Sequence, residues 1–227
     1  MLETLRNAFK IKDLRKRIGF TFLMLIVVRI GSQLPIPGVD PDVFSQLFAN
    51  SGDALNFFDA ITGGSFENMS IFALNITPYI TSSIIIQLLT IAFPKLEEMQ
   101  RDGEQGRKKM TQITRYVTVG LAVVQSLAMA IGFGRAGYLT KFNALYVILT
   151  VAALTAGSSV LMWIGERITE KGIGNGISIV LVINIISRIP SDLTSLFEQF
   201  ISGKTIAKGT LSGVIIAAII VAMVVLV

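Results

Sequence analysis

Long, uninterrupted runs of apolar residues constrain this chain more than any other feature of its sequence. The runs from Ser70 to Phe93 and from Ala144 to Ile164 are each close to the ~20 residues that a helix needs to cross a bilayer. Their apolar residues do not alternate with polar ones, which argues against the strands of a membrane barrel. Only 15% of the 227 residues are charged, against about 25% in soluble domains. The sequence therefore predicts an all-α polytopic membrane protein.

Proline, glycine and charged residues divide the chain into spans and connecting segments. PIPGVDPDVF (35–44) breaks the first run, because proline cannot continue a helix. ALNFFDAIT (54–62) is too short to cross the core, and Gly63 and Gly64 are expected to end it. The expected segments are an amphipathic lead (1–17), a first span (18–34), an external segment (35–69), a second span (70–93), a cytoplasmic loop (94–115), a third span (116–133), a fourth span (144–164), a cytoplasmic loop (165–176), a fifth span (177–189), an external segment (190–210) and the start of a sixth span (211–227).

The distribution of lysine and arginine predicts the orientation of these spans. With the N-terminus inside, the cytoplasmic segments hold fourteen basic residues and the external segments hold five. Loops rich in Lys and Arg stay in the cytoplasm, so we expect a cytoplasmic N-terminus, and we attribute the net charge of +5 to topology instead of nucleic-acid binding. No small-residue cleavage site follows the first run, so we expect a spanning helix and not a signal peptide. For Arg29, within this span, snorkelling to the outer interface is favoured over a polar contact in a channel wall.

The absence of cysteine and histidine excludes several kinds of chemistry. Thiol nucleophiles, disulfides, Cys/His metal sites and histidine acid–base catalysis all require these residues. No Asp, Glu or Lys lies in the middle of a span, which argues against an intramembrane hydrolase and against ion-coupled transport. We therefore expect no catalytic residue, no cofactor and no metal.

The segment NITPYITSSIIIQLL (75–89) combines an apolar run with many small polar side chains. On a helical wheel these polar groups fall on several faces, which suits a helix that packs among others or borders water. Ile76 and Ile80 are four residues apart and point the same way, as do Ile177 and Leu181 in the fifth span. Two facing helices could join these four side chains in a narrow collar that holds back water by dewetting. The pattern alone favours ordinary core packing.

Two long segments resemble the signature segments of the SecY family of protein-conducting channels. They are SIFALNITPYITSSIIIQLL (70–89) and MWIGERITEKGIGNGISIVLV (162–182); RIGSQLPIPGVD (29–40), GEQGRKK (103–109) and TRYVTV (114–119) are similar too. The chain departs from the family at Asn75, where Gly is usual. It also corresponds to only the first of two pseudo-symmetric halves and the start of a sixth span. The resemblance implies a SecY-type helical bundle, first half, with a short non-spanning plug helix.

The resemblance also implies roles for individual residues. It makes a pore ring the better interpretation of the collar residues Ile76, Ile80, Ile177 and Leu181. It places a plug that swings away during transport near residues 57–66, with Phe57, Phe58, Ala60, Ile61, Gly63 and Gly64. It assigns to one side of a lateral gate Thr81, Ser82, Ser83, Gln87 and Thr90. It assigns to a cytoplasmic partner surface Arg101, Arg107, Lys108 and Lys109.

The leading hypothesis for function is a passive conduit without chemistry of its own. It would conduct unfolded secretory polypeptides across the bacterial plasma (inner) membrane and release signal or transmembrane helices laterally into lipid. The implied partners are SecE and SecG, a SecA motor or a translating ribosome, the secretory precursor with its signal peptide, membrane lipid and the C-terminal half of the same protein. The alternatives are half of a secondary transporter and a non-conducting membrane scaffold.

Overall fold

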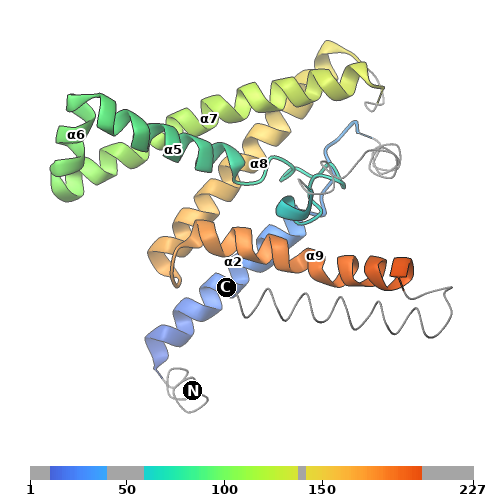
Figure 1. Cartoon of the computed structure of the whole chain (residues 1–227), viewed down its shortest axis with the longest axis horizontal. Helices are drawn as coiled ribbons and strands as arrows, with labels where there is room; N and C mark the ends of the chain where they lie inside the picture. Colours follow the sequence, from blue (N-terminus) through green and yellow to red (C-terminus); the bar gives the residue numbers. More distant parts are fainter. Residues whose placement is uncertain (1–10, 40–58, 138–141, 201–227) are drawn as a thin grey trace. The chain divides into compact units, whose positions relative to one another are not determined.

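The computed structural model describes residues 11–39, 59–137 and 142–200. The chain forms two compact units, residues 1–185 and residues 186–227, and the second holds the end of the last helix. Within the described ranges the helices of eight or more residues are α2 (Lys12–Gly31), α5 (Thr77–Ala92), α6 (Pro94–Arg101), α7 (Gly103–Arg135), α8 (Ala144–Lys171) and α9 (Gly176–Phe200) (Figure 1). A helical turn at 59–62 precedes α5. The predicted all-α architecture is confirmed for this part of the chain.

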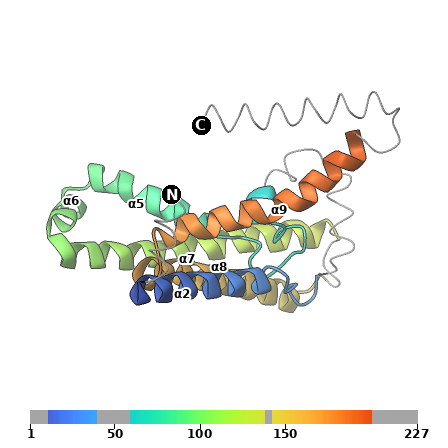
Figure 2. The same ribbon diagram turned by 90° about the horizontal axis from the view of Figure 1, so that it is seen from below.

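Helix α8 is the central packing element of the first unit. It packs against both α2 and α7 (Figure 2), while α5 packs against α7. The short helix α6 packs back on α5 and α7, at the reversal between them (Figure 1). The first unit is therefore organised around the α7–α8 pair.

Only some of the predicted spans stand as single membrane-length helices. Among the described residues, α7 and α8 are long and apolar enough to cross a membrane, and α5 with α6 qualifies only as a pair bent by 105°. The first predicted span (18–34) lies mostly in α2, a helix that also carries Arg15, Lys16 and Arg17 near its start and Arg29 near its end. With these charges, α2 is not among the helices that are apolar enough to cross a membrane by themselves. The predicted sixth span (211–227) lies outside the described residues.

The predicted second span (70–93) was wrong at its start. Residues 70–76 form turns, and the helix begins only at Thr77. Met69 and Asn75 have φ angles of 40° and 52°, a left-handed conformation that cannot continue an α-helix. Pro78 then occupies the first turn of α5, where its missing N–H has no helical partner to lose.

The segment 94–115, predicted as a cytoplasmic loop, is almost entirely helical. It comprises α6 and the first turns of α7. Ion pairs one helical turn apart stabilise both helices, since Arg101 lies 2.6 Å from Glu97 and Lys108 lies 2.9 Å from Glu104. The 33 residues of α7 make a helix of about 50 Å, which exceeds the ~30 Å core of a bilayer. Helix α7 therefore extends beyond the membrane.

The predicted fourth span begins where α8 begins, whereas the predicted ends of the fourth and fifth spans differ from the ends of α8 and α9. Helix α8 begins at Ala144 as predicted, because the Asn143 side chain accepts a hydrogen bond from the Ala144 N–H at 2.7 Å. It continues to Lys171 through most of the predicted loop 165–176. The fifth predicted span (177–189) is part of α9, which contains Pro190 without ending there.

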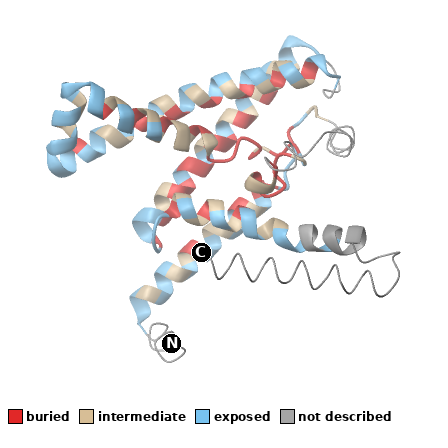
Figure 3. Cartoon of the chain, in the orientation of Figure 1, coloured by how far each residue is buried: buried red, intermediate tan, exposed pale blue. Residues whose placement is uncertain are grey.

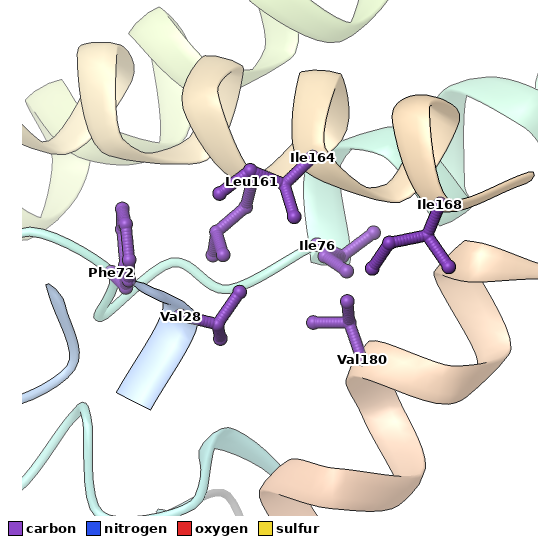
Figure 4. Close-up of a cluster of buried hydrophobic side chains, with 7 residues drawn as sticks. All are labelled: Val28, Phe72, Ile76, Leu161, Ile164, Ile168 and Val180. Atoms are coloured by element: carbon purple, nitrogen blue, oxygen red, sulfur yellow. The ribbon is translucent and has the colours of Figure 1, made fainter. Parts of the chain in front are cut away.

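Two clusters of buried side chains hold the first unit together, and both use the non-helical segment before α5. The Phe66 cluster consists of Ile36, Phe66, Met69, Ala73, Leu74 and Leu154. The Ile76 cluster consists of Val28, Phe72, Ile76, Leu161, Ile164, Ile168 and Val180 (Figure 4). Figure 3 shows buried residues concentrated in the segment between the 59–62 turn and α5. This segment is therefore part of the core.

Small residues let the helices approach closely, as is common in membrane proteins. Ser82 on α5 and Thr118 on α7 share a hydrogen bond of 2.5 Å, and Ser126 on α7 and Thr155 on α8 share one of 3.1 Å. Gly157 on α8 lies directly against the backbone carbonyl of Ile71. The close approach at Gly157 fixes the non-helical segment against α8.

We predict that Gly157→Ala destabilises the protein, because the added Cβ would collide with the Ile71 carbonyl. Overpacking of this kind costs about 1–3 kcal/mol. Thermal denaturation of the purified protein in detergent measures the effect. Gly120→Ala in α7 is the control, because nothing lies within 4 Å of the added Cβ, and it should be neutral or slightly stabilising. Equal melting temperatures for the two variants would contradict the prediction.

Candidate functional site

A cavity of about 430 Å³ opens among α5, α7, α8 and the start of α9. Helix α5 contributes polar and apolar side chains to its wall, α7 and α8 contribute polar ones, and the start of α9 contributes Ile177. The lining residues are Tyr79, Ile80, Ser83, Ile84, Thr111, Arg115, Glu166, Thr169, Glu170, Asn175 and Ile177. We call this space the α5–α9 cavity.

An ion pair forms the most polar part of the cavity wall. The Nε of Arg115 on α7 donates to the Oε1 of Glu166 on α8 at 2.7 Å. The Glu166 side chain is 14% exposed and the Arg115 side chain 44%, so the pair is partly shielded from solvent. A pair of this exposure contributes on the order of 1 kcal/mol, and it also fixes the distance between α7 and α8 at the cavity.

Two of the four predicted ring residues line the cavity, and we call the apolar part of the wall formed by Ile80 and Ile177 the cavity floor. Ile80 and Ile177 line the cavity and pack against the Ile76 cluster. The Ile76 side chain is fully buried between α8 and Val180 (Figure 4), so it does not line the cavity. Leu181 is half-buried and belongs neither to this lining nor to the Ile76 cluster.

The predicted plug falls partly within the described residues. Ala60 and Ile61 are half-buried in the helical turn at 59–62, whereas Phe57 and Phe58 lie outside the described part of the chain. Gly63 and Gly64 end this turn as predicted, with φ angles of 70° and 81° that glycine adopts without steric cost.

Asp59 fastens the start of the turn to the chain that follows. Its carboxylate is fully buried and accepts hydrogen bonds from the Glu67 N–H at 2.8 Å and from the Thr62 hydroxyl at 3.3 Å. These bonds hold the two ends of the glycine reversal together.

The predicted gate residues divide into a set that packs within the bundle and a set that lines cavities. Ser82 and Thr90 are buried, and their hydroxyls bond within α5 or to α7. Thr81 is half-buried and donates to the Thr77 carbonyl. Ser83 lines the α5–α9 cavity, and with Gln87 it also lines a second cavity of about 360 Å³ between α5 and α7. Packing against α7 and a place in a cavity wall thus both occur on the same helix.

The predicted partner residues lie on α6 and the start of α7. All four side chains are exposed: Arg101, Arg107, Lys108 and Lys109. Arg101 and Lys108 form ion pairs within their own helices, and Arg107 lines the second cavity. The helical reversal therefore presents charges of both signs.

Sequence reasoning missed the pairing of Arg115 with Glu166. The two residues are 51 positions apart, and no local spacing links them. The sequence predicts that Arg115 and Glu166 lie in two separate cytoplasmic loops, 94–115 and 165–176. In the part of the chain that the structure describes, no group of three or more acidic side chains is placed to hold a metal ion.

Solved structures with a similar fold include protein-conducting channels. One is a structure titled as that of a protein conducting channel, and another is Sec61 in the canine ribosome–channel complex from the endoplasmic reticulum. Each aligns with a TM-score of 0.58 at 18% sequence identity, over 78% of this chain and 37% of the solved chain. The chain therefore has the fold of this class of membrane protein, and it is a multi-pass membrane protein.

Curated relatives at much higher identity are named protein translocase subunit SecY. The chain is 41% identical to that of Pseudomonas aeruginosa over 92% of its length, 44% identical to that of Rickettsia conorii over 95%, and 46% identical to that of Porphyra purpurea over 87%. It spans about half the length of each, 49%, 50% and 48% respectively. The sequence profile of the SecY family matches residues 70–227, and the chain therefore belongs to the SecY family.

Proposed function

We propose that this chain forms one half of the central subunit of a protein translocation channel. The observation that carries the proposal is the α5–α9 cavity, whose wall combines the Arg115–Glu166 ion pair with the apolar side chains of Ile80 and Ile177. The names of the relatives and of the similar structures support the same function. An extended polypeptide would enter the polar part of this cavity and pass the isoleucines at its floor.

The proposed mechanism separates passage of the polypeptide from leakage of small ions. Branched aliphatic side chains repel water and ions when no polypeptide is present, because a narrow apolar constriction loses its water. The same side chains can move aside for a passing chain. The energy would come from a bound motor or from translation.

The proposal includes partners and a location that follow from the family. They are SecE and SecG, a SecA motor or a translating ribosome, a secretory precursor, and the second half of the channel, in a bacterial plasma membrane with the N-terminus inside. The exposed charges of α6 and α7 would face the motor or ribosome. The lateral gate would involve α5 and α7, whose contact depends on small polar groups such as the Ser82–Thr118 pair.

A secondary transporter is the second candidate, because bent helices also occur in that class. The bend of 105° between α5 and α6 is the observation that favours it. In the described part of the chain, however, both acidic residues that line the cavity are paired, Glu166 with Arg115 and Glu170 with Arg167. Coupled transport usually needs an ionisable group that is free to change its protonation, so we prefer the channel.

We predict that a translocating polypeptide touches Ile80. The full-length parent would carry Ile80→Cys, and a secretory precursor with one cysteine would be arrested during transit. A disulfide should form between the two, because Ile80 lies at the cavity floor, and the reactive precursor position should move with the arrest point. Gel electrophoresis without reductant measures the product.

The matched control is Val124→Cys, on the exposed side of α7. The chain has no native cysteine, so each variant reports a single site. Crosslinking at position 124 but not at 80, while the precursor still crosses, would contradict the proposed path.

We also predict that deletion of residues 57–61 makes the full-length channel leak ions. The deletion removes the start of the proposed plug and spares Thr62, Ser65 and Phe66, which are buried. Conductance of reconstituted membranes without precursor should rise above that of the parent, because the apolar ring alone would then close the path. Unchanged conductance at equal protein content would contradict the channel proposal and favour a scaffold.

A further inference from the structure

A buried asparagine lies at the centre of a polar network between the proposed plug and the helices. The Nδ2 of Asn75 donates to the Ile61 carbonyl at 3.2 Å, and its Oδ1 accepts from the Nδ2 of Asn184 on α9 at 3.2 Å. The Ser158 hydroxyl on α8 donates to the Asn75 backbone carbonyl, also at 3.2 Å. Asn75 is 1% exposed and Asn184 2%. One residue thus connects three separate parts of the chain, two through its side chain and one through its backbone.

The backbone at Asn75 does not by itself require an asparagine. Its φ of 52° lies in the left-handed region, which glycine adopts at no cost and asparagine tolerates. Its N–H closes a tight turn on the Phe72 carbonyl at 2.8 Å, and glycine would close the same turn. The specific contribution of asparagine is therefore the two hydrogen bonds of its side-chain amide.

The carbonyl that Asn75 binds would otherwise need another partner. The last carbonyls of a helical turn have no partner within the helix, and an unsatisfied carbonyl away from water is costly. Two side chains from elsewhere in the fold satisfy the end of the 59–62 turn. Asn75 binds the Ile61 carbonyl, and the Nη1 of Arg29 on α2 donates to the Gly63 carbonyl at 3.2 Å.

The two carbonyls lie at different places relative to the glycine pair. The Ile61 carbonyl precedes the glycine pair, whereas the Gly63 carbonyl belongs to it. After the pair, Ser65 and Phe66 are buried in the core. A swing of the 59–62 turn about the glycines would break the Asn75–Ile61 bond. The Arg29–Gly63 bond lies at the pivot, so it can persist through the swing.

We propose that Asn75 is a positioning residue that latches the proposed plug in its closed position through the Ile61 carbonyl. The inference rests on the proposed function, because a latch matters only if residues 59–62 move. Asn184 orients the amide by donating to its oxygen, which leaves the Asn75 nitrogen directed at Ile61. Asp59 also ties the turn to the chain after the glycines, through the Glu67 N–H. Loss of the Asn75 bond therefore weakens the closed position of the turn, while α5 remains anchored by the turn at 72–75.

The test is the ion conductance of the full-length parent, reconstituted in planar bilayers without precursor. Asn75→Gly keeps the backbone conformation and removes the amide, so the open fraction should rise about fivefold, for the one hydrogen bond to the Ile61 carbonyl that is lost. Asn75→Asp keeps the size of the side chain and the acceptor for Asn184 but cannot donate to Ile61, and it should also leak.

Ser158→Ala is the matched control within the same network. It removes the hydrogen bond to the Asn75 backbone and leaves the amide contacts in place. It should lower the melting temperature without raising the conductance. Equal conductance for Ser158→Ala and Asn75→Gly would show general loosening of the turn and overturn the latch.

Deletion of residues 57–61, measured in parallel, separates the latch from the channel. If the deletion leaks and Asn75→Gly and Asn75→Asp do not, the latch is wrong and the channel proposal stands. If neither the deletion nor the substitutions leak, the channel proposal itself is wrong. Leakage from the deletion and from both substitutions, with a silent Ser158→Ala, supports the latch.

Discussion

The structure depends on how a non-helical segment, residues 65–76, satisfies its backbone polar groups inside an apolar bundle. Such a segment is tolerated in a membrane protein only where the protein itself supplies the partners. The Met69 carbonyl accepts from the Ile36 N–H at 2.9 Å, and the Ile71 N–H donates to the Leu34 carbonyl at 3.0 Å. These bonds tie the segment to the chain after α2. Because the segment is fixed, α5 begins at a defined point, Thr77, about one helical turn before Ile80 in the sequence.

The α7–α8 pair forms one wall of the α5–α9 cavity, and the separate helices α5 and α9 carry the proposed ring residues. Helices α7 and α8 form the wall, joined by the Arg115–Glu166 ion pair and by the Ser126–Thr155 hydrogen bond. Helices α5 and α9 bring Ile80 and Ile177 to the cavity floor. The two isoleucines contact the Ile76 cluster through apolar surface alone, which can slide at lower cost than hydrogen-bonded contacts. Passage of a polypeptide would therefore displace α5 and α9 side chains and leave the wall in place.

The sequence predicted the features that depend on local pattern. The apolar runs located α8 and most of α7, and the glycine pair at 63 and 64 correctly ended the preceding turn. Hydropathy failed at 70–76, because apolar turn residues and apolar helix residues look alike when averaged along a run. It failed at α6 for the opposite reason, since charged residues there form a helix through pairs one turn apart. The contacts of Asn75 and of Arg115 join residues far apart in the sequence, and no spacing rule finds them.

The most direct test of the central claim is to bridge the cavity floor. Cysteines at positions 80 and 177 of the full-length parent would be joined by a short bismaleimide, and precursor transport would be measured before and after. Bridging positions 123 and 152, which line an apolar groove between α7 and α8, is the control. The account predicts that the 80–177 bridge stops transport and that the control bridge leaves it unchanged. Transport at the parent rate through a fully bridged floor would show that the polypeptide takes another path.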